Sequence, residues 1–265
     1  MTWFPTPSSH LIPKLPRRVS TACGCSLFYS LDRTSQFTSL SLRLAELLLK
    51  RISMTQQIGG EHKWGGNELR RAARSAMKPS EAIRRAGLDR SLPELMAMAT
   101  SPQDPGWHPE GDVLTHSLLA ADAAASAWDA ERRRDGRREI VVLAALFHDV
   151  GKPATTRVTL GRLTSPGHAE VGKSLVLRMS RRLSWPDDLS LAVAELTANH
   201  MVHLSVKGDP TPRAVRRLTE RLTAQGTSLE EWSVLVNADG AARGSASIPD
   251  RAAPWLRVAN SLQCP

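Results

Sequence analysis

The feature that most constrains the fold is a succession of segments with a helical pattern, separated by short polar or Pro/Gly-containing breaks. From residue 113 onward these segments cover about 113–129, 139–150, 167–183, 188–203, 212–224 and 229–238. Only Thr155–Thr164 suggests a short pair of strands. Helices of this length with short connections pack side by side, so the pattern predicts an all-α bundle.

Shorter helices are expected ahead of this series. One ends before Pro79, a second begins with Ser80 as its N-cap and ends at Gly87, and a third covers Ser91–Thr100. Ser101–Asp112 is predicted to be a loop because it contains several prolines and glycines. These helices would lead into the main bundle.

Residues 1–53 differ from the rest because they are basic and serine-rich and contain only two acids, Asp32 and Glu46. Three interpretations stay open: an over-extended start with Met54 as the initiator, which we favour, a poorly structured N-terminal arm, and a targeting segment. The expected organisation is an N-terminal extension (1–53), a helical lead-in (54–106), the main domain (107–244) and a C-terminal tail (245–265).

Composition narrows the class of protein. With 265 residues, of which 41% are hydrophobic, the chain is long enough to build a core. No stretch approaches the roughly 20 apolar residues that cross a bilayer, so no membrane partner is expected. The 3 cysteines are interpreted as reduced thiols of a cytoplasmic protein. The net charge of +9 weakly suggests a polyanionic partner, since a GC-rich genome would also enrich arginine.

Four histidines are spaced symmetrically about breaks between helices. His116 and His148 are 32 positions apart, and the polar segment "AERRRDGRRE" lies at their midpoint. His168 and His200 are also 32 positions apart, and "WPDD" lies beside their midpoint. Two antiparallel helices folded about each break would bring each histidine pair together at one end of a hairpin.

Two aspartates end apolar helices in the same series. Asp149 directly follows His148, and Asp239 precedes a Gly-containing stop. A buried carboxylate needs a partner, because burying it unpaired is costly. Imidazole and carboxylate ligands suit Zn, Mn, Fe, Co or Ni, and the lack of thiolates argues against a structural zinc site. We therefore predict that His116, His148, Asp149 and Asp239 bind a divalent metal and that Lys152 contacts phosphate.

Each residue alone also has an ordinary structural role open to it. Asp149 could cap a turn, Lys152 could be solvated near a helix end, and Asp239 could simply end its helix. The joint pattern favours the metal site. His108 and His203 are expected to support the site or the structure rather than to bind metal.

The sequence resembles a known family through five motifs. These are, in order, "WHPEGDVLTHSLLAADAAA", "ALFHDVGK", "GHAEVGKSLVLRMSRRLSWP", "VAELTANHMVHL" and "ADGAARG". They resemble the HD-domain metal-dependent phosphohydrolases, and in particular the C-terminal HD domain of bacterial bifunctional tRNA nucleotidyltransferases (CCA-adding enzymes). The segment "ELRRAARSAMKPSEAIRRAGLDRSLPELMAM" also resembles the helical segment that leads into that domain. The likeness covers about Glu68 to Gly244, so 107–244 would be the HD domain.

The resemblance implies an enzyme that hydrolyses phosphoesters of nucleotides or RNA ends, such as 2′,3′-cyclic phosphates and 2′-phosphates. Hydroxide on a metal held by the predicted ligands would attack phosphorus, with Asp149 and Lys152 as catalytic residues and Asp149 bridging if two ions bind. By resemblance, His168 and His200 would bind a second metal or contact phosphate. One or two ions are expected, with Ni, Mn, Co, Fe, Zn and also Mg as candidates.

A basic helix offers a possible contact with RNA such as tRNA. Its arginines are Arg213, Arg216, Arg217 and Arg221. A solvated basic face is the slightly favoured alternative, because few aromatic residues accompany the arginines to support base stacking.

The nucleotidyltransferase motif that holds catalytic magnesium is not found before Glu68, so CCA addition is not expected. Two other functions stay open: hydrolysis of other nucleotides or alarmones, and a non-catalytic RNA-binding relic.

Overall fold

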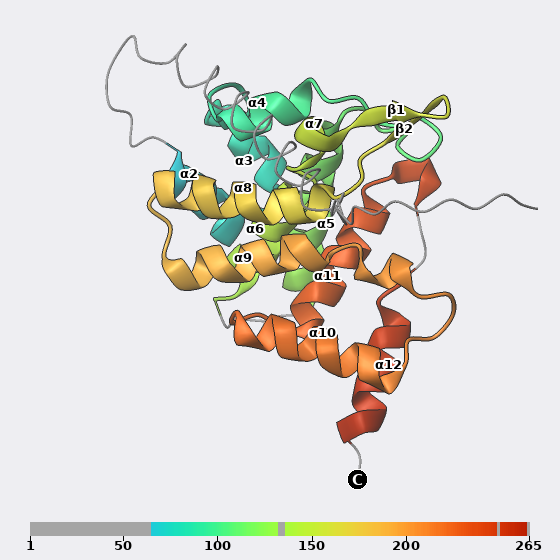
Figure 1. The fold of residues 1–265 in the computed structure, drawn as a ribbon. Helices are drawn as coiled ribbons and strands as arrows, with labels where there is room; N and C mark the ends of the chain where they lie inside the picture. Colours follow the sequence, from blue (N-terminus) through green and yellow to red (C-terminus); the bar gives the residue numbers. More distant parts are fainter. Residues whose placement is uncertain (1–64, 132–135, 248–249, 264–265) are drawn as a thin grey trace, which may run out of the picture.

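A computed structural model describes residues 65–131, 136–247 and 250–263. Within them helices dominate, beside one two-stranded sheet, so the all-α prediction is confirmed (Figure 1). The helices are α2 (Gly66–Ser75), α3 (Pro79–Arg85), α4 (Pro93–Ala99), α5 (Val113–Ala130), α6 (Arg138–Phe147), α7 (Lys152–Thr155), α8 (His168–Arg182), α9 (Asp187–Asn199), α10 (Pro212–Ala224), α11 (Leu229–Ala241) and α12 (Ala253–Gln263). Residues 1–53 and Met54 lie outside the described residues.

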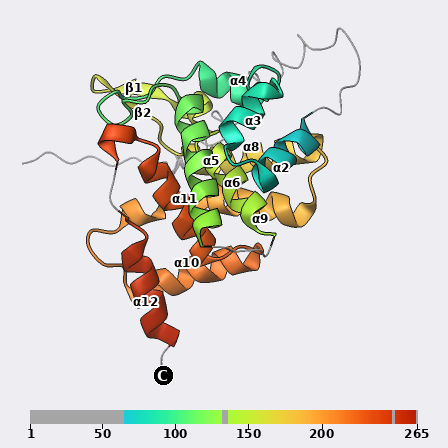
Figure 2. The same ribbon diagram turned by 180° about the vertical axis from the view of Figure 1, so that it is seen from behind.

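The centre of the molecule is built by α5, α6 and α11, which pack on one another; in the view from behind, α5 and α6 lie in front of α8 and α9 (Figure 2). The α8–α9 hairpin joins them through contacts of α9 with α6 and α11. Ala120, Ala121, Ala124 and Ala125 of α5 are completely buried, and these small side chains allow neighbouring helices to approach closely. Helix α6 is apolar on nearly all sides because neighbours surround it.

The lead-in helices cover one side of this centre, with α2 on α6 and both α3 and α4 on α5. The prediction that Ser80 caps α3 is wrong. The helix begins at Pro79, two residues earlier than a Ser80 cap would imply, with Lys78 at the N-cap; the fixed φ of Pro79 suits the first helical position. The N–H and hydroxyl of Ser80 instead donate to the carboxylate of Asp122 on α5. Gly87 follows α3 with a φ of 69°, as its predicted place at the helix end requires.

Helix α9 ends earlier than the predicted boundary near residue 203. Its last residue is Asn199, and a short 3-10 turn at Val202–Ser205 follows. The Asn199 side chain donates to the Glu195 carbonyl and the Trp232 indole N–H donates to the Asn199 carbonyl at 2.8 Å. Tertiary hydrogen bonding therefore satisfies this helix end, and His200 lies directly beyond it.

The predicted strand pair is present as β1 (Arg157–Thr159) and β2 (Arg162–Thr164). The strands are antiparallel, with Val158 opposite Leu163. Leu160 and Gly161 in the turn have φ values of 50° and 75°, which match the twist of a tight two-residue hairpin. Figure 1 shows the hairpin at the same end of the bundle as α7.

Helix α12 forms where the sequence suggested only a C-terminal tail. Trp255 is 3% exposed and its ring lies 5.4 Å from that of Trp232 on α11, in an edge-to-face arrangement. An aromatic contact with the core thus anchors the helix. None of the helices in the described residues combines the length and apolar character that crossing a bilayer requires.

Candidate metal centre

The first group of predicted ligands comes together at the ends of three helices. His116 lies in the first turn of α5, His148 directly follows α6, and Asp239 lies in the last turn of α11. The Nε2 atom of His116 is 3.0 Å from Oδ1 of Asp239, and Nε2 of His148 is 3.8 Å from the same oxygen. Nε2 of His148 is also 3.2 Å from Oδ2 of Asp149. The structure thus brings together all four residues predicted to bind the first metal.

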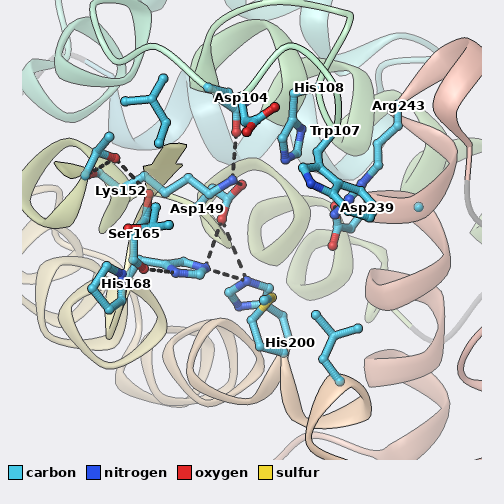
Figure 3. A pocket seen from close by; sticks show the side chains of 18 of the residues that line it. Asp104, Trp107, His108, Asp149, Lys152, Ser165, His168, His200, Asp239 and Arg243 are labelled. Atoms are coloured by element: carbon cyan, nitrogen blue, oxygen red, sulfur yellow. Dashed lines mark hydrogen bonds and ion pairs between the residues drawn. The ribbon is translucent and has the colours of Figure 1, made fainter. Parts of the chain in front are cut away.

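The second histidine pair lies on the other side of Asp149 (Figure 3). His168 begins α8 and His200 follows α9, and their Nε2 atoms are 3.1 Å apart. Oδ1 of Asp149 is 3.2 Å from Nε2 of His168 and 3.7 Å from Nε2 of His200. Asp149 therefore directs Oδ2 toward one group and Oδ1 toward the other, so each of its oxygens faces a different histidine pair.

Backbone carbonyls orient three of the four imidazole rings. In each case Nδ1 donates to the carbonyl three residues earlier: His148 to Ala145 at 2.8 Å, His168 to Ser165 at 2.7 Å and His200 to Thr197 at 2.6 Å. A carbonyl can only accept, so the proton of the neutral ring is on Nδ1 and the lone pair of Nε2 points into the site. This is the tautomer that binds metal through Nε2.

Glu110 orients the fourth ring, a role that was not predicted from the sequence. Its Oε1 is 2.6 Å from Nδ1 of His116 and 2.8 Å from Nδ1 of His108. A carboxylate behind a metal-binding histidine is a common supporting contact. The available signal was its position in "WHPEGD", six residues before His116. His108 thus shares with His116 the carboxylate of Glu110 and supports the site. His203 also supports a ligand candidate, because its Nδ1 donates to the His200 carbonyl at 2.9 Å.

The electrostatics of the site fit a cation. Burial alone would raise the pKa of Asp149, but Lys152 and His148 outweigh burial and hold the pKa well below its usual range. Burial would also raise the pKa of Asp239, yet its hydrogen bond with His116 and the nearby His148 keep it well below its usual range. Both carboxylates are therefore ionised at neutral pH, and both are at most 5% exposed.

The histidines respond to burial in two ways. Burial, together with His148 and His168, lowers the pKa of His200 to about 3, so this ring is neutral at physiological pH. Burial would likewise lower the pKa of His116, but hydrogen bonds with Asp239 and Glu110 raise it to about 9. A metal ion that binds His116 would therefore displace a proton.

The arrangement of the donor atoms fits a divalent metal. Within each of two triads, His116/His148/Asp239 and Asp149/His168/His200, one donor atom per residue lies within 4.8 Å of the others. Nε2 of His148 is buried without a hydrogen-bond partner, which is costly unless another group satisfies it. A metal bound by imidazole and carboxylate groups would satisfy this atom.

Two cations flank the carboxylates. Nζ of Lys152, at the start of α7, is 2.6 Å from Oδ2 of Asp149 and 2.7 Å from Oε1 of Gln103. Nη2 of Arg243, just after α11, is 3.2 Å from Oδ1 of Asp239. Lys152 is a residue predicted from the sequence to contact phosphate, whereas Arg243 was not predicted. A pocket lies over the candidate ligands and is lined by Asp149, His168, His200 and Asp239 among others.

The basic residues of α10 are exposed, and none of them lines this pocket: Arg213, Arg216, Arg217 and Arg221.

The match to a family of known proteins agrees with this geometry. The family model described as "HD domain" matches residues 113–231. These residues form an HD domain. They include both histidine pairs and Asp149, whereas Asp239 lies beyond the matched range. The HD superfamily comprises metal-dependent phosphohydrolases, and the His/Asp groups of this HD domain could hold such a metal.

Several relatives carry the description "Multifunctional CCA protein". The protein of Halorhodospira halophila is 36% identical over 196 residues, which cover 71% of this chain and 45% of the relative. That of Cupriavidus metallidurans is 33% identical over 201 residues, which cover 73% of this chain and 44% of the relative. That of Verminephrobacter eiseniae is 32% identical over 204 residues, which cover 76% of this chain and 46% of the relative. The similarity thus spans less than half the length of these relatives, and it lies over their HD region.

Proposed function

We propose that the chain is a metal-dependent phosphohydrolase that acts on phosphoesters of nucleotides or RNA ends, such as 2′,3′-cyclic phosphates and 2′-phosphates. The observation that carries the proposal is the position of Asp149, whose two oxygens face two separate histidine pairs beneath a pocket. Carboxylate-bridged sites of this kind suit phosphoester hydrolysis.

The residues of the chain have distinct roles in this proposal. The first metal would be held by His116, His148, Asp149 and Asp239, and a second by Asp149, His168 and His200. When bound, the metal supplies a Lewis acid and lowers the pKa of water. The low pKa of Asp149 keeps its carboxylate ionised, which is the form needed to bind a cation.

Lys152 and Arg243 would stabilise the charge that gathers on phosphate oxygens. Both line the pocket over the ligands, and each lies beside one ligand carboxylate. Gln103 also accepts from Lys152, which holds the ammonium group in position. Donors that are already oriented before the reaction stabilise developing charge without reorganising, which is the larger part of their effect.

The substrate preference rests on the resemblance of the motifs and on the similarity to multifunctional CCA proteins. The net charge of +9 agrees with a polyanionic substrate. Other nucleotides, alarmones included, remain the second class of substrate. A non-catalytic RNA-binding role is the alternative that the intact set of ligand side chains disfavours.

The test is hydrolysis of 2′,3′-cyclic AMP by protein stripped of metal and reloaded with Ni, Mn, Co, Zn or Mg. We expect metal-dependent turnover that falls by ~10²-fold or more in Asp149→Asn, because this change removes the bridging charge with little change in volume. Asp209→Asn is the matched control, since Asp209 is an exposed aspartate outside the pocket.

Three results would change the conclusion in different ways. Equal turnover by Asp149→Asn and the unmodified protein would contradict the site assignment. Tight metal binding without turnover would move the search to other nucleotides. Neither binding nor turnover would favour the RNA-binding alternative.

A further inference from the structure

One aromatic side chain differs from all others in the described part of the chain. Trp107 is 55% exposed, whereas each of the others is at most 5% exposed. These others are Trp128, Phe147, Trp185, Trp232 and Trp255. An indole usually stabilises a fold by burying its large surface, so packing in the core does not explain Trp107.

The backbone around Trp107 is held in place. Its N–H donates to the Asp104 carbonyl at 3.0 Å, and the N–H of Gly106 donates to Oδ1 of Asp104 at 2.9 Å. The next residue, His108, is tied to Glu110, which also orients the metal-ligand candidate His116. The indole is therefore presented from a segment that is connected to the metal centre.

Trp107 lines the same pocket as the ligand side chains, which has a volume of about 530 Å³. This volume lies in the range of sites for small molecules. The pocket has a buried floor, with Asp149, His200 and Asp239 at most 5% exposed, and an exposed rim that includes Trp107. In Figure 3, Trp107 lies on the side of Asp239, opposite Lys152.

The cations around this pocket suit an anionic ligand. Lys152, Arg243 and Arg251 all line it. Nε of Arg243 is buried and has no hydrogen-bond partner, although Nη2 contacts Asp239. Apolar groups, among them Leu204, complete the wall. A ligand with a charged end and a flat apolar end would match this combination of floor and rim.

We propose that Trp107 stacks on the base of a nucleoside phosphate whose phosphate group lies over the metal-ligand floor. The inference deepens the proposed function and rests on it for the position of the phosphate. Stacking on an indole is available to every base, so the residue would provide affinity for nucleotides as a class rather than for one base.

The test separates the base from the phosphate by calorimetry on Mn²⁺-loaded protein. One probe is the AMP isostere in which a methylene group replaces O5′, and the other is the corresponding phosphonate of ribose without a base. Neither is cleaved at its P–C bond. Trp107→Ala should weaken binding of the nucleotide probe by about 5- to 150-fold, the range measured for loss of one stacked base.

Three comparisons isolate stacking from a change in the fold. Binding of the base-less probe should be unchanged in Trp107→Ala, and Trp107→Phe should recover most of the affinity for the nucleotide probe. Met77→Ala, which shortens a 90% exposed side chain outside the pocket, should bind both probes normally. A short RNA with a terminal phosphate, added as competitor, distinguishes an RNA end from a free nucleotide as the source of the base.

Three results would overturn the proposal. Trp107→Ala could weaken the binding of both probes equally, it could leave the affinity for both unchanged, or the unmodified protein could bind neither probe. Failure of the proposed function is distinguishable from these results. In that case 2′,3′-cyclic AMP is not hydrolysed, yet the dependence of nucleotide binding on Trp107 persists.

Discussion

Asp149 reaches two histidine pairs because it occupies the residue directly after His148, where α6 has just ended. His148 points its Nε2 to one side of the carboxylate, while the start of α8 and the end of α9 supply His168 and His200 on the other. A carboxylate has two oxygens that both accept, so one side chain can serve both sides at once.

A substitution of Glu110 should weaken metal binding, although Glu110 is not one of the predicted metal ligands. Glu110→Gln abolishes the negative charge that accepts from Nδ1 of His116, so the ring becomes less basic and less firmly oriented. We expect metal affinity to fall about 10- to 100-fold, measured by competition with a chelator.

Glu230→Gln, an exposed glutamate on α11, is the matched control for this change. Unaltered affinity in Glu110→Gln would show that His116 does not need its carboxylate partner. Equal weakening in both variants would point to a general effect of net charge.

The elements converge because hairpins place helix ends at one side of the bundle. His116 and His168 lie at the starts of α5 and α8, while His148 and His200 lie just beyond the ends of α6 and α9. Antiparallel packing of α5 on α6 and of α8 on α9 therefore pairs them, as the symmetric spacing predicted. The spacing did not indicate how close the two hairpins would approach.

Gly151 marks the close approach of the two hairpins. A Cβ atom at this position would lie 2.0 Å from the His168 carbonyl oxygen and 2.8 Å from the Gly172 N. Both are backbone atoms, so Gly151→Ala must displace the start of α8. We expect a loss of about 1–3 kcal/mol in the free energy of unfolding, measured by urea denaturation, together with weaker metal binding.

Gly106→Ala is the control for Gly151→Ala, because the added methyl group would meet only the Asp104 carboxylate, at 3.2 Å. Its free energy of unfolding should change by much less. A Gly151→Ala protein with normal stability and normal metal affinity would contradict the role assigned to this contact.

Across the whole molecule, α5, α6, α8, α9 and α11 each place at least one candidate ligand at a common site. A metal that binds only the folded arrangement stabilises the fold by mass action. At a free metal concentration about 100 times Kd, the gain is about 2.7 kcal/mol. This corresponds to a rise in Tm of roughly 5–11 °C for a domain of this size, measured by calorimetry with and without metal.

Chelator should reverse the rise, and Asp149→Asn should abolish most of it while the exposed control Asp209→Asn retains it. A metal-independent Tm in the unmodified protein would mean that the ligands do not act together on one bound ion.

The sequence by itself determined most of the helices and the set of candidate ligands, because periodicity, breaks and residue chemistry are local properties. The symmetric histidine spacings and the adjacent His148 and Asp149 are examples. Tertiary structure decided what depends on contacts between distant segments. One example is the hydrogen bond between Glu110 and His116. Others are the end of α9 at Asn199, whose carbonyl accepts from Trp232, and the packing of α12 on the core through Trp255. Which partner a carboxylate, a helix end or an indole finds is set by packing across the fold, and one-dimensional patterns do not contain that information.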